Sequence, residues 1–198
     1  MANTRPSATS LRPEPITGLI LAGGAGSRMG GVDKGLQFYR GKLLVQWVIA
    51  CLAPQVDELI ISANRNLDTY SALGYQVVTD SDAEDYAGPL AGLQAGLSAA
   101  RHELVLCVPC DTPHLPNTLA SRLVSALGEA PMAVARCTGH PQPTVCLVRS
   151  KLLPALSEFL ASGERKMGWW QRQNGAIYVD FDDVSAFANL NTNDDLAL

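Results

Sequence analysis

Short apolar runs rich in Val, Ile and Leu alternate with longer amphipathic segments along most of the chain. Such runs are typical of strands covered by helices on both faces, and their alternation with helical periodicity favours β-α units. We therefore predict an α/β fold that is three-layer and Rossmann-like, with a mostly parallel sheet. The predicted strands cover residues 17–21, 58–62, 76–78, 104–108, 132–136, 144–148 and 176–179. The predicted helices cover residues 42–52, 89–100, 115–127, 151–161 and 164–171, with a short terminal helix beginning near Asn193.

The length of 198 residues, of which 47% are hydrophobic, suits one domain with its own core. Residues 1–14 are rich in Ser, Thr, Pro and Arg and lack apolar periodicity, so we predict a flexible tail there and a single domain over residues 15–198. The five cysteines are odd in number and lie mostly in apolar runs, as reduced core thiols do. We expect no disulfide framework.

Charge and hydropathy argue against several classes of partner. A formal net charge of -4 provides no overall positive field, so we expect no nucleic acid as a partner. No apolar run approaches the roughly 20 residues of a membrane-spanning helix, so we expect no membrane association. The apolar stretch 16–22 follows Pro13, Glu14 and Pro15, whereas a secretory signal would have basic or apolar residues there. A cytoplasmic protein is expected.

A glycine-rich segment, LILAGGAGSRMGGVDK over residues 19–34, directly follows the first predicted strand. Glycines allow backbone N–H groups to approach a phosphate closely, and Arg28 and Lys34 would offset its charge. An ordinary flexible loop is the plain alternative, which the two cations make less attractive. In open α/β sheets, ligands bind at the carboxyl ends of the strands, which is where this segment lies.

Two well-known phosphate-binding patterns do not fit the segment. The dinucleotide pattern starting at Gly24 requires Gly or Ala where Met29 stands, and the second strand leads into Ser62, Ala63 and Asn64 without the expected acidic residue. The P-loop pattern requires Ser or Thr where Leu43 follows Lys42. Neither a nicotinamide enzyme nor a P-loop enzyme is favoured.

The string LAGGAGSRMGGVDK, followed by GKLL at residues 41–44, resembles the signature of nucleotidyltransferases that move a nucleoside monophosphate from an NTP to a phosphorylated acceptor. Together with the C-terminal segments described below, it resembles most the molybdenum cofactor guanylyltransferase family, from Ile16 onward. The resemblance implies a nucleotide-binding part over about residues 15–115 and an acceptor-binding part over about residues 130–198. It implies nucleotide contacts from Leu21, Ala22, Gly23, Gly24, Gly26, Lys34, Asn64, Asp80, Gly88 and Asp111.

Carboxylates follow two of the predicted strands. Asp111 comes just after the strand at 104–108, where a carboxylate is placed to hold Mg²⁺ on triphosphate oxygens, and in the family this aspartate binds the metal. A side-chain turn with Thr112 and Pro113 is the alternative, and both can hold together. Asp80 follows the strand at 76–78 and offers an acceptor for the N–H donors of guanine, although by local sequence alone a solvated turn is favoured. The resemblance implies that Asp80 and Asn64 contact the nucleotide.

Cysteine and histidine chemistry is weakly indicated. Cys107 and Cys110 have C-x-x-C spacing, but redox motifs begin a helix with an exposed first thiol, and Cys107 lies within a strand pattern. No zinc site is expected, because there is no second cysteine pair and the histidines, His102, His114 and His140, lack ligand spacing.

The segments 139–148, 161–170 and 187–196 resemble the acceptor side of the same family. Arg165 and Lys166 are candidate contacts to the acceptor phosphate or pterin, with a solvated helix face as the alternative. Asn189 and Asn191 are candidate polar groups at the same cleft. The family's usual NTPEEL reads NTNDDL here, a change that a helix N-terminus accepts.

The resemblance implies that molybdopterin, with or without bound molybdenum, attacks the α-phosphorus of GTP, with Mg²⁺ as cofactor and other molybdenum-cofactor proteins as possible partners. Arg28, Lys34 and Asp111 are the predicted catalytic residues, Asp111 being also the metal ligand. Two alternatives stay open: a cytidylyltransferase for the same pterin, which would differ in its base contacts near Asp80, and a non-catalytic GTP-binding regulator. The three catalytic candidates argue against the regulator, because a sensor has little need to stabilise a leaving group.

Overall fold

The computed structural model describes residues 14–23, 33–80 and 88–190. Seven strands form one sheet in the order β5-β4-β1-β6-β8-β7-β9. The strands are β1 (Ile16–Leu21), β4 (Glu58–Ser62), β5 (Gln76–Val78), β6 (Leu104–Pro109), β7 (Met132–Cys137), β8 (His140–Arg149) and β9 (Ile177–Phe181). Only β8 pairs antiparallel with its neighbours, so the sheet is mostly parallel, as predicted.

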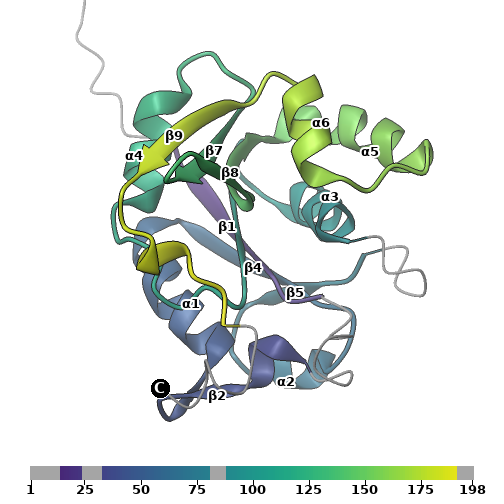
Figure 1. Ribbon diagram of the computed structural model, residues 1–198. Coiled ribbons are helices and arrows are strands. Elements are labelled where there is room, and N and C mark those ends of the chain that lie inside the picture. Colours follow the sequence, from purple (N-terminus) through teal and green to yellow (C-terminus); the bar gives the residue numbers. More distant parts are fainter. Residues whose placement is uncertain (1–13, 24–32, 81–87, 191–198) are drawn as a thin grey trace, which may run out of the picture.

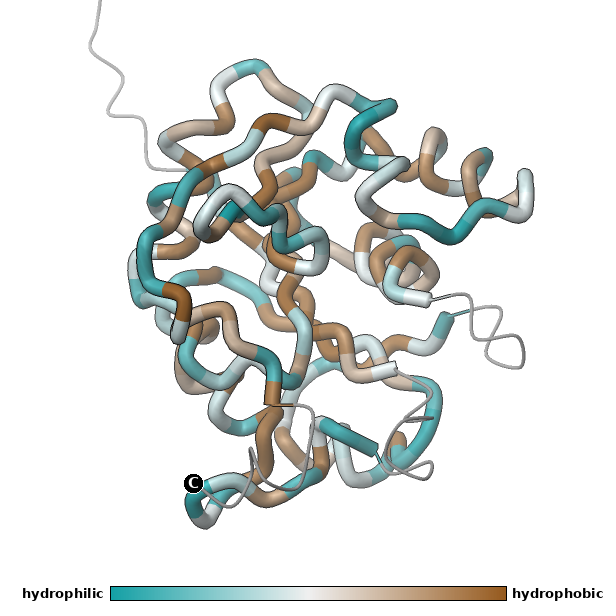
Figure 2. Tube along the Cα trace, viewed as in Figure 1, coloured by the Kyte–Doolittle hydropathy of each residue, from teal (hydrophilic) through white to brown (hydrophobic). Residues whose placement is uncertain are grey.

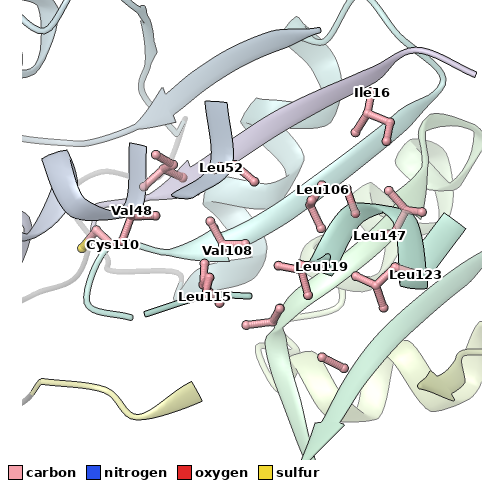
Figure 3. Packing of buried hydrophobic residues seen from close by; sticks show 14 of the residues in the cluster. Ile16, Val48, Leu52, Leu106, Val108, Cys110, Leu115, Leu119, Leu123 and Leu147 are labelled. Atoms are coloured by element: carbon pink, nitrogen blue, oxygen red, sulfur yellow. The ribbon is translucent and has the colours of Figure 1, made fainter. Parts of the chain in front are cut away.

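Helices cover both faces of this sheet, which confirms the three-layer arrangement (Figure 1). One face carries α1 (Leu44–Leu52) and α4 (Leu119–Leu127), and the other carries α3 (Pro89–Ala99), α5 (Leu153–Ala161) and α6 (Met167–Gln173). Successive strand residues point to opposite faces, so Ile20 belongs to one core and Leu19 to the other, and both are fully buried. Figure 3 shows the first core, in which α1 and α4 pack on β1 and β6.

The hydropathy colouring in Figure 2 shows hydrophobic residues concentrated on the central strands and hydrophilic residues on the outer segments. None of the helices in the described ranges is long and apolar enough to span a bilayer.

Helix α3 presents two glycines to the sheet, at positions where a larger side chain would not fit. A Cβ on Gly96 would overlap the Leu19 side chain of β1, and a Cβ on Gly92 would lie 2.8 Å from the Ser62 hydroxyl of β4. Gly88, the residue before the helix, has φ 75° and ψ -168°, a conformation essentially reserved for glycine. These glycines place the start of α3 beside the ends of β1 and β4.

The predicted helix at 115–127 begins late, at Leu119, and the reason is local. Leu115 precedes Pro116, and a residue before proline is disfavoured in helical conformation. The Pro116 carbonyl instead accepts a hydrogen bond from the Leu119 N–H.

Strand β8 (His140–Arg149) is longer than the predicted range 144–148. The predicted range was short because Pro141 and Pro143 argue against a strand. His140 and Pro141 pair with β7 alone, whereas β6 pairs with β8 from Cys146 onward. Pro143 lies in the stretch where the β7–β8 register shifts, so both prolines lie where a strand tolerates proline, on a one-sided segment or at an irregularity.

The predicted helix at 42–52 begins at Leu44 because Lys42–Leu43 form strand β3, paired with β2 (Phe38–Tyr39). The two-residue turn between them, Arg40-Gly41, has positive φ at both positions, as in a type I′ hairpin. Several short segments were not predicted: strand β2, helix α2 (Leu67–Ser71) and the 3₁₀ turns η2 (Lys34–Leu36), η3 (Ala53–Gln55) and η5 (Ser185–Phe187). The terminal helix predicted near Asn193 and the tail at 1–13 lie outside the described residues, and the division into a nucleotide-binding and an acceptor-binding part stays a prediction.

Candidate functional site

The carboxyl ends of four parallel strands are joined by backbone hydrogen bonds beyond the strands themselves. The Ala22 N–H donates to the Ser62 carbonyl (2.7 Å), the Cys110 N–H to the Leu21 carbonyl (3.0 Å) and the Ala63 N–H to the Val78 carbonyl (2.9 Å). The sheet reverses its strand order between β1 and β6, which is where open α/β sheets bind ligands. The predicted residues Leu21, Ala22, Gly23, Asn64, Asp80 and Asp111 all lie at this edge.

Lys34 and Asp111 form an ion pair at this edge. The Lys34 Nζ lies 3.2 Å from Asp111 Oδ2, with side chains 25% and 13% exposed, although 77 residues separate them. Asp111 is held at the end of β6, and its carbonyl accepts a hydrogen bond from the Leu190 N–H (2.9 Å). A cation and a carboxylate therefore share one partly buried position at this edge, and the catalytic roles predicted for both residues stay predictions.

Asn64 connects two strand ends. Its Oδ1 accepts a hydrogen bond from the Asp80 N–H (3.2 Å), and a Cβ on Gly23 would lie 3.4 Å from its Nδ2. Asp80 Oδ1 is buried and has no hydrogen-bond partner within the described ranges. An unpaired buried acceptor is costly, which marks Asp80 as a side chain suited to receive a donor from a ligand.

The acceptor-side candidates divide into two groups. Asn189 lies beside the Lys34–Asp111 pair, because its Oδ1 accepts a hydrogen bond from Thr112 Oγ1 (2.9 Å), next to Asp111. Arg165 and Lys166 lie between α5 and α6, and Arg165 Nη1 donates to the carbonyls of Leu160 and Glu164. Arg165 therefore supports the end of α5. Gly24, Gly26, Arg28 and Asn191 lie outside the described residues.

The C-x-x-C cysteines face opposite sides of the sheet. Cys107 packs into the core under α3 and Cys110 into the core under α1. A hydrogen bond with Cys146, and next burial, raise the pKa of the Cys107 thiol, and burial raises that of Cys110. All five cysteines are free, and Cys107, Cys110, Cys137 and Cys146 are buried, as the sequence predicts for core thiols.

A buried polar network beside Lys34 was missed by the sequence reasoning. The Asp33 carboxylate is 7% exposed, and it accepts hydrogen bonds from the Tyr70 hydroxyl (2.6 Å) and from Asn66 Nδ2 (3.0 Å). The one signal in the sequence was the position of Asp33 next to Lys34. Its partners are Tyr70 in α2, a helix that had not been predicted, and Asn66 directly before that helix.

The donor set suits a metal held mainly by its substrate. Over the described ranges, no three His, Cys, Asp or Glu residues are grouped to hold an ion. Mg²⁺ is commonly bound through one or two carboxylates plus substrate phosphates and waters. Asp111, with one oxygen paired to Lys34, fits a site of that kind.

Comparisons with known proteins agree with this geometry. A family model described as "MobA-like NTP transferase domain" matches residues 18–176. A protein named molybdenum cofactor guanylyltransferase from Burkholderia ambifaria (strain MC40-6) is 48% identical, over 95% of this chain and 97% of its own. One of the same name from Ralstonia nicotianae is 45% identical, over 89% and 92%.

Solved structures show the same fold. A molybdopterin-guanine dinucleotide biosynthesis protein A from Archaeoglobus fulgidus has a TM-score of 0.75 at 20% identity, covering 91% of this chain and 95% of its own. Rv0371C from Mycobacterium tuberculosis, solved in complex with manganese, has a TM-score of 0.69 at 18% identity, covering 91% and 95%. The chain is therefore a nucleotidyltransferase that belongs to the MobA-like NTP transferase family and, within it, to the molybdenum cofactor guanylyltransferases.

Proposed function

We propose that this protein transfers GMP from GTP to the terminal phosphate of molybdopterin, whether or not the pterin carries molybdenum. An oxygen of the acceptor phosphate attacks the α-phosphorus of GTP and forms the new P–O bond. The bond from the α-phosphorus to the bridging oxygen of the β-phosphate breaks, and pyrophosphate leaves with that electron pair. The products are molybdopterin guanine dinucleotide and pyrophosphate. Because the acceptor phosphate is already an anion at neutral pH, no general base is required.

The observation that carries this proposal is the Lys34–Asp111 pair at the switch point of the sheet. The reaction needs alignment of the two phosphates and neutralisation of the charge that moves onto pyrophosphate. Lys34 supplies a fixed positive charge, and Arg28 is proposed to supply a second. The backbone N–H groups of residues 21–31 are proposed to hold the triphosphate.

Asp111 is the residue proposed to hold Mg²⁺. A divalent cation bound there would neutralise triphosphate oxygens and orient the α-phosphorus for attack. The relative Rv0371C, solved with manganese, supports a divalent metal in this fold. Lys34 already holds one carboxylate oxygen of Asp111, Oδ2, by a hydrogen bond of 3.2 Å.

Base selection is proposed to fall to Asp80. Guanine presents the N1–H and the N2 amino group as donors, and the buried Oδ1 of Asp80 has its acceptor capacity open within the described ranges. Cytosine presents a different edge, with an acceptor at N3 beside its amino group. A carboxylate at this position therefore favours GTP over CTP.

The acceptor side is proposed to include Asn189 and Asn191, and Arg165 and Lys166 earlier in the chain. Asn189 has the best support, because it accepts a hydrogen bond from Thr112, the residue that follows Asp111. For Arg165, the guanidinium must release its backbone carbonyls, or use its remaining N–H groups, to reach a phosphate.

The test is pyrophosphate release from GTP, CTP and ATP by the purified protein with molybdopterin and Mg²⁺, alongside calorimetric titration with each nucleotide. We expect GTP-selective binding and acceptor-dependent pyrophosphate release. Selective use of CTP would make the protein a cytidylyltransferase. GTP binding without pyrophosphate release would make it a regulator, and no triphosphate binding would overturn the site itself.

A further inference from the structure

Asp33 is a buried carboxylate whose two oxygens are both engaged by side chains of a different element. The Tyr70 hydroxyl donates to Oδ1 and the Asn66 amide donates to Oδ2. Burial, followed by nearby negative charge including that of Asp33, raises the pKa of Tyr70. The phenol therefore keeps its proton across the physiological range and remains a donor.

The donors come from a segment with its own constraints. Tyr70 is fully buried in α2, and Asn66 precedes that helix with φ 52° and ψ 35°, a left-handed conformation that asparagine tolerates better than most residues. The N–H groups of Thr69 and Tyr70 both donate to the Asn66 carbonyl. Asn66 and Tyr70 therefore approach Asp33 as one unit.

Lys34 is the next residue and begins the turn η2. The Asp33 carbonyl accepts hydrogen bonds from the Leu36 N–H (3.2 Å) and from Gln37 Nε2 (3.2 Å), so Asp33 fixes this turn through its backbone as well. The residue after Lys34, Gly35, is tightly enclosed. A Cβ on Gly35 would overlap the Tyr70 hydroxyl and lie 3.4 Å from Cys110 Sγ. The backbone of Lys34 is thus held between α2 and the end of β6.

We propose that Asp33, held by hydrogen bonds from Tyr70 and Asn66, is a positioning residue that sets where the Lys34 ammonium lies against Asp111. This inference rests on the proposed function, in which Lys34 neutralises the leaving pyrophosphate. Within the described ranges, the hydrogen-bond partners of Asp33 are Tyr70, Asn66 and residues of its own turn. Asp33 acts through the turn, because its side chain points into the protein while the neighbouring Lys34 reaches Asp111. The hydrogen bonds among Asp33, Asn66 and Tyr70 thus fix the position of the adjacent Lys34.

A double-variant cycle with Tyr70→Phe and Lys34→Ala tests the proposal in the full-length protein. Tyr70→Phe removes one hydroxyl, and we expect kcat to fall about 10- to 100-fold because Lys34 is displaced. In the Lys34→Ala background the same substitution should change kcat by less than about twofold, because the residue it acts through is gone. Tyr75→Phe is the matched control, a tyrosine at the edge of the same core, and should leave kcat unchanged.

Additive losses in the two backgrounds would overturn the proposal, as would an unchanged kcat in Tyr70→Phe. Asp33→Asn retains the size of the side chain and serves as the second variant if Tyr70→Phe does not fold. It should show the same dependence on Lys34. Thermal unfolding of each variant separates loss of position from loss of fold.

An arm without turnover separates this proposal from the proposed function. In protein labelled with ¹³C,¹⁵N-lysine, the Lys34 side-chain NMR signal is identified by its disappearance in Lys34→Ala. We expect Tyr70→Phe to move that signal toward those of the exposed lysines, and an unmoved signal would overturn the positioning role. If the wild-type protein releases no pyrophosphate, the proposed function fails, and the NMR result alone then decides whether Asp33 positions Lys34.

Discussion

The side-chain oxygen of Asn64 accepts a hydrogen bond from the Asp80 N–H at 3.2 Å, so the residue after β4 holds the residue that follows β5. Asn64 was predicted as a direct nucleotide contact. The structure gives its Oδ1 a partner in the protein, and the Asp80 carboxylate is the group with an unpaired buried oxygen among the described residues. The two residues are therefore expected to select the base together.

Removing either member of this pair should weaken GTP binding. Asp80→Asn replaces one acceptor oxygen by a donor amide, and we expect a loss of about 1–3 kcal/mol in GTP binding free energy. Asn64→Ala should weaken binding less, because it loosens the backbone of Asp80 without removing the acceptor. Calorimetric titration with GTP measures both. The double variant should lose little more than Asp80→Asn alone, and full additivity would show that Asn64 and Asp80 act separately.

Lys34→Ala should reduce turnover far more than stability. We expect kcat for pyrophosphate release to fall about 10²- to 10³-fold, the usual effect of deleting one group that stabilises transition-state charge. The side chain is 25% exposed, so water can enter the space that its truncation leaves. Circular dichroism and thermal unfolding check the fold. Lys151→Ala, at an exposed lysine two residues after the end of β8, is the control. If Lys34→Ala unfolds, the role of Lys34 is structural.

Glu58 is expected to make stability depend on acid pH. Burial alone raises the pKa of this carboxyl, but hydrogen bonds from the Thr17 hydroxyl and from Arg101 outweigh it and hold the pKa below its ordinary value. A lowered folded-state pKa contributes stability above the unfolded pKa of about 4.3, and that contribution is lost as pH falls through the folded pKa.

Glu58→Gln tests this dependence. Urea unfolding at pH 7 and at an acid pH below the unfolded pKa of about 4.3 should show a smaller acid loss of unfolding free energy in the variant than in the wild type. Glu129→Gln, at an exposed glutamate, should retain the wild-type dependence. Equal acid losses in Glu58→Gln and the wild type would contradict the prediction.

Gly96→Ala should destabilise the protein despite favouring the helix. Alanine gains up to about 1 kcal/mol of helix propensity over glycine. Its Cβ, however, would overlap the Leu19 side chain, and overpacking of this kind costs about 1–3 kcal/mol. Ser98→Ala, exposed on the same helix, should be neutral or slightly stabilising. Chemical denaturation compares the two, and a stabilised Gly96→Ala would show that α3 can move outward at little cost.

Local patterns in the sequence were enough to predict the strands that build the site. The ranges 58–62 and 76–78 match β4 and β5, and β1 and β6 differ from their predicted ranges by one residue each. Their continuous apolar character follows from burial on both faces, which is a property of each strand by itself. The ends of these strands, and hence the edge that carries Asp111, followed from the same pattern.

The parts that were missed depend on contacts between distant residues. Asp33 becomes a buried carboxylate only because Tyr70 and Asn66 meet it across 33 to 37 positions, and a five-residue helix such as α2 has little periodicity to read. The predicted range for β8 was too short because it left out Pro141 and Pro143. These prolines are acceptable in the strand because β6 does not pair with that part of β8. The glycine-rich signature and the strand ends assigned Lys34 and Asp111 to one site, but the ion pair between them was not predicted.

The direction of β8 has a consequence for how enzymes of this architecture diversify. Because β8 runs back from β7 through the two-residue turn Thr138-Gly139, the tip of this hairpin lies at the same edge as Asp111. Surface loops accept insertions at a small cost in free energy, so residues can be added at this turn beyond the last pair of the two strands. One half of the sheet can thus be extended toward a new acceptor by insertions at a single tip, while the parallel half that is proposed to hold the triphosphate keeps its geometry.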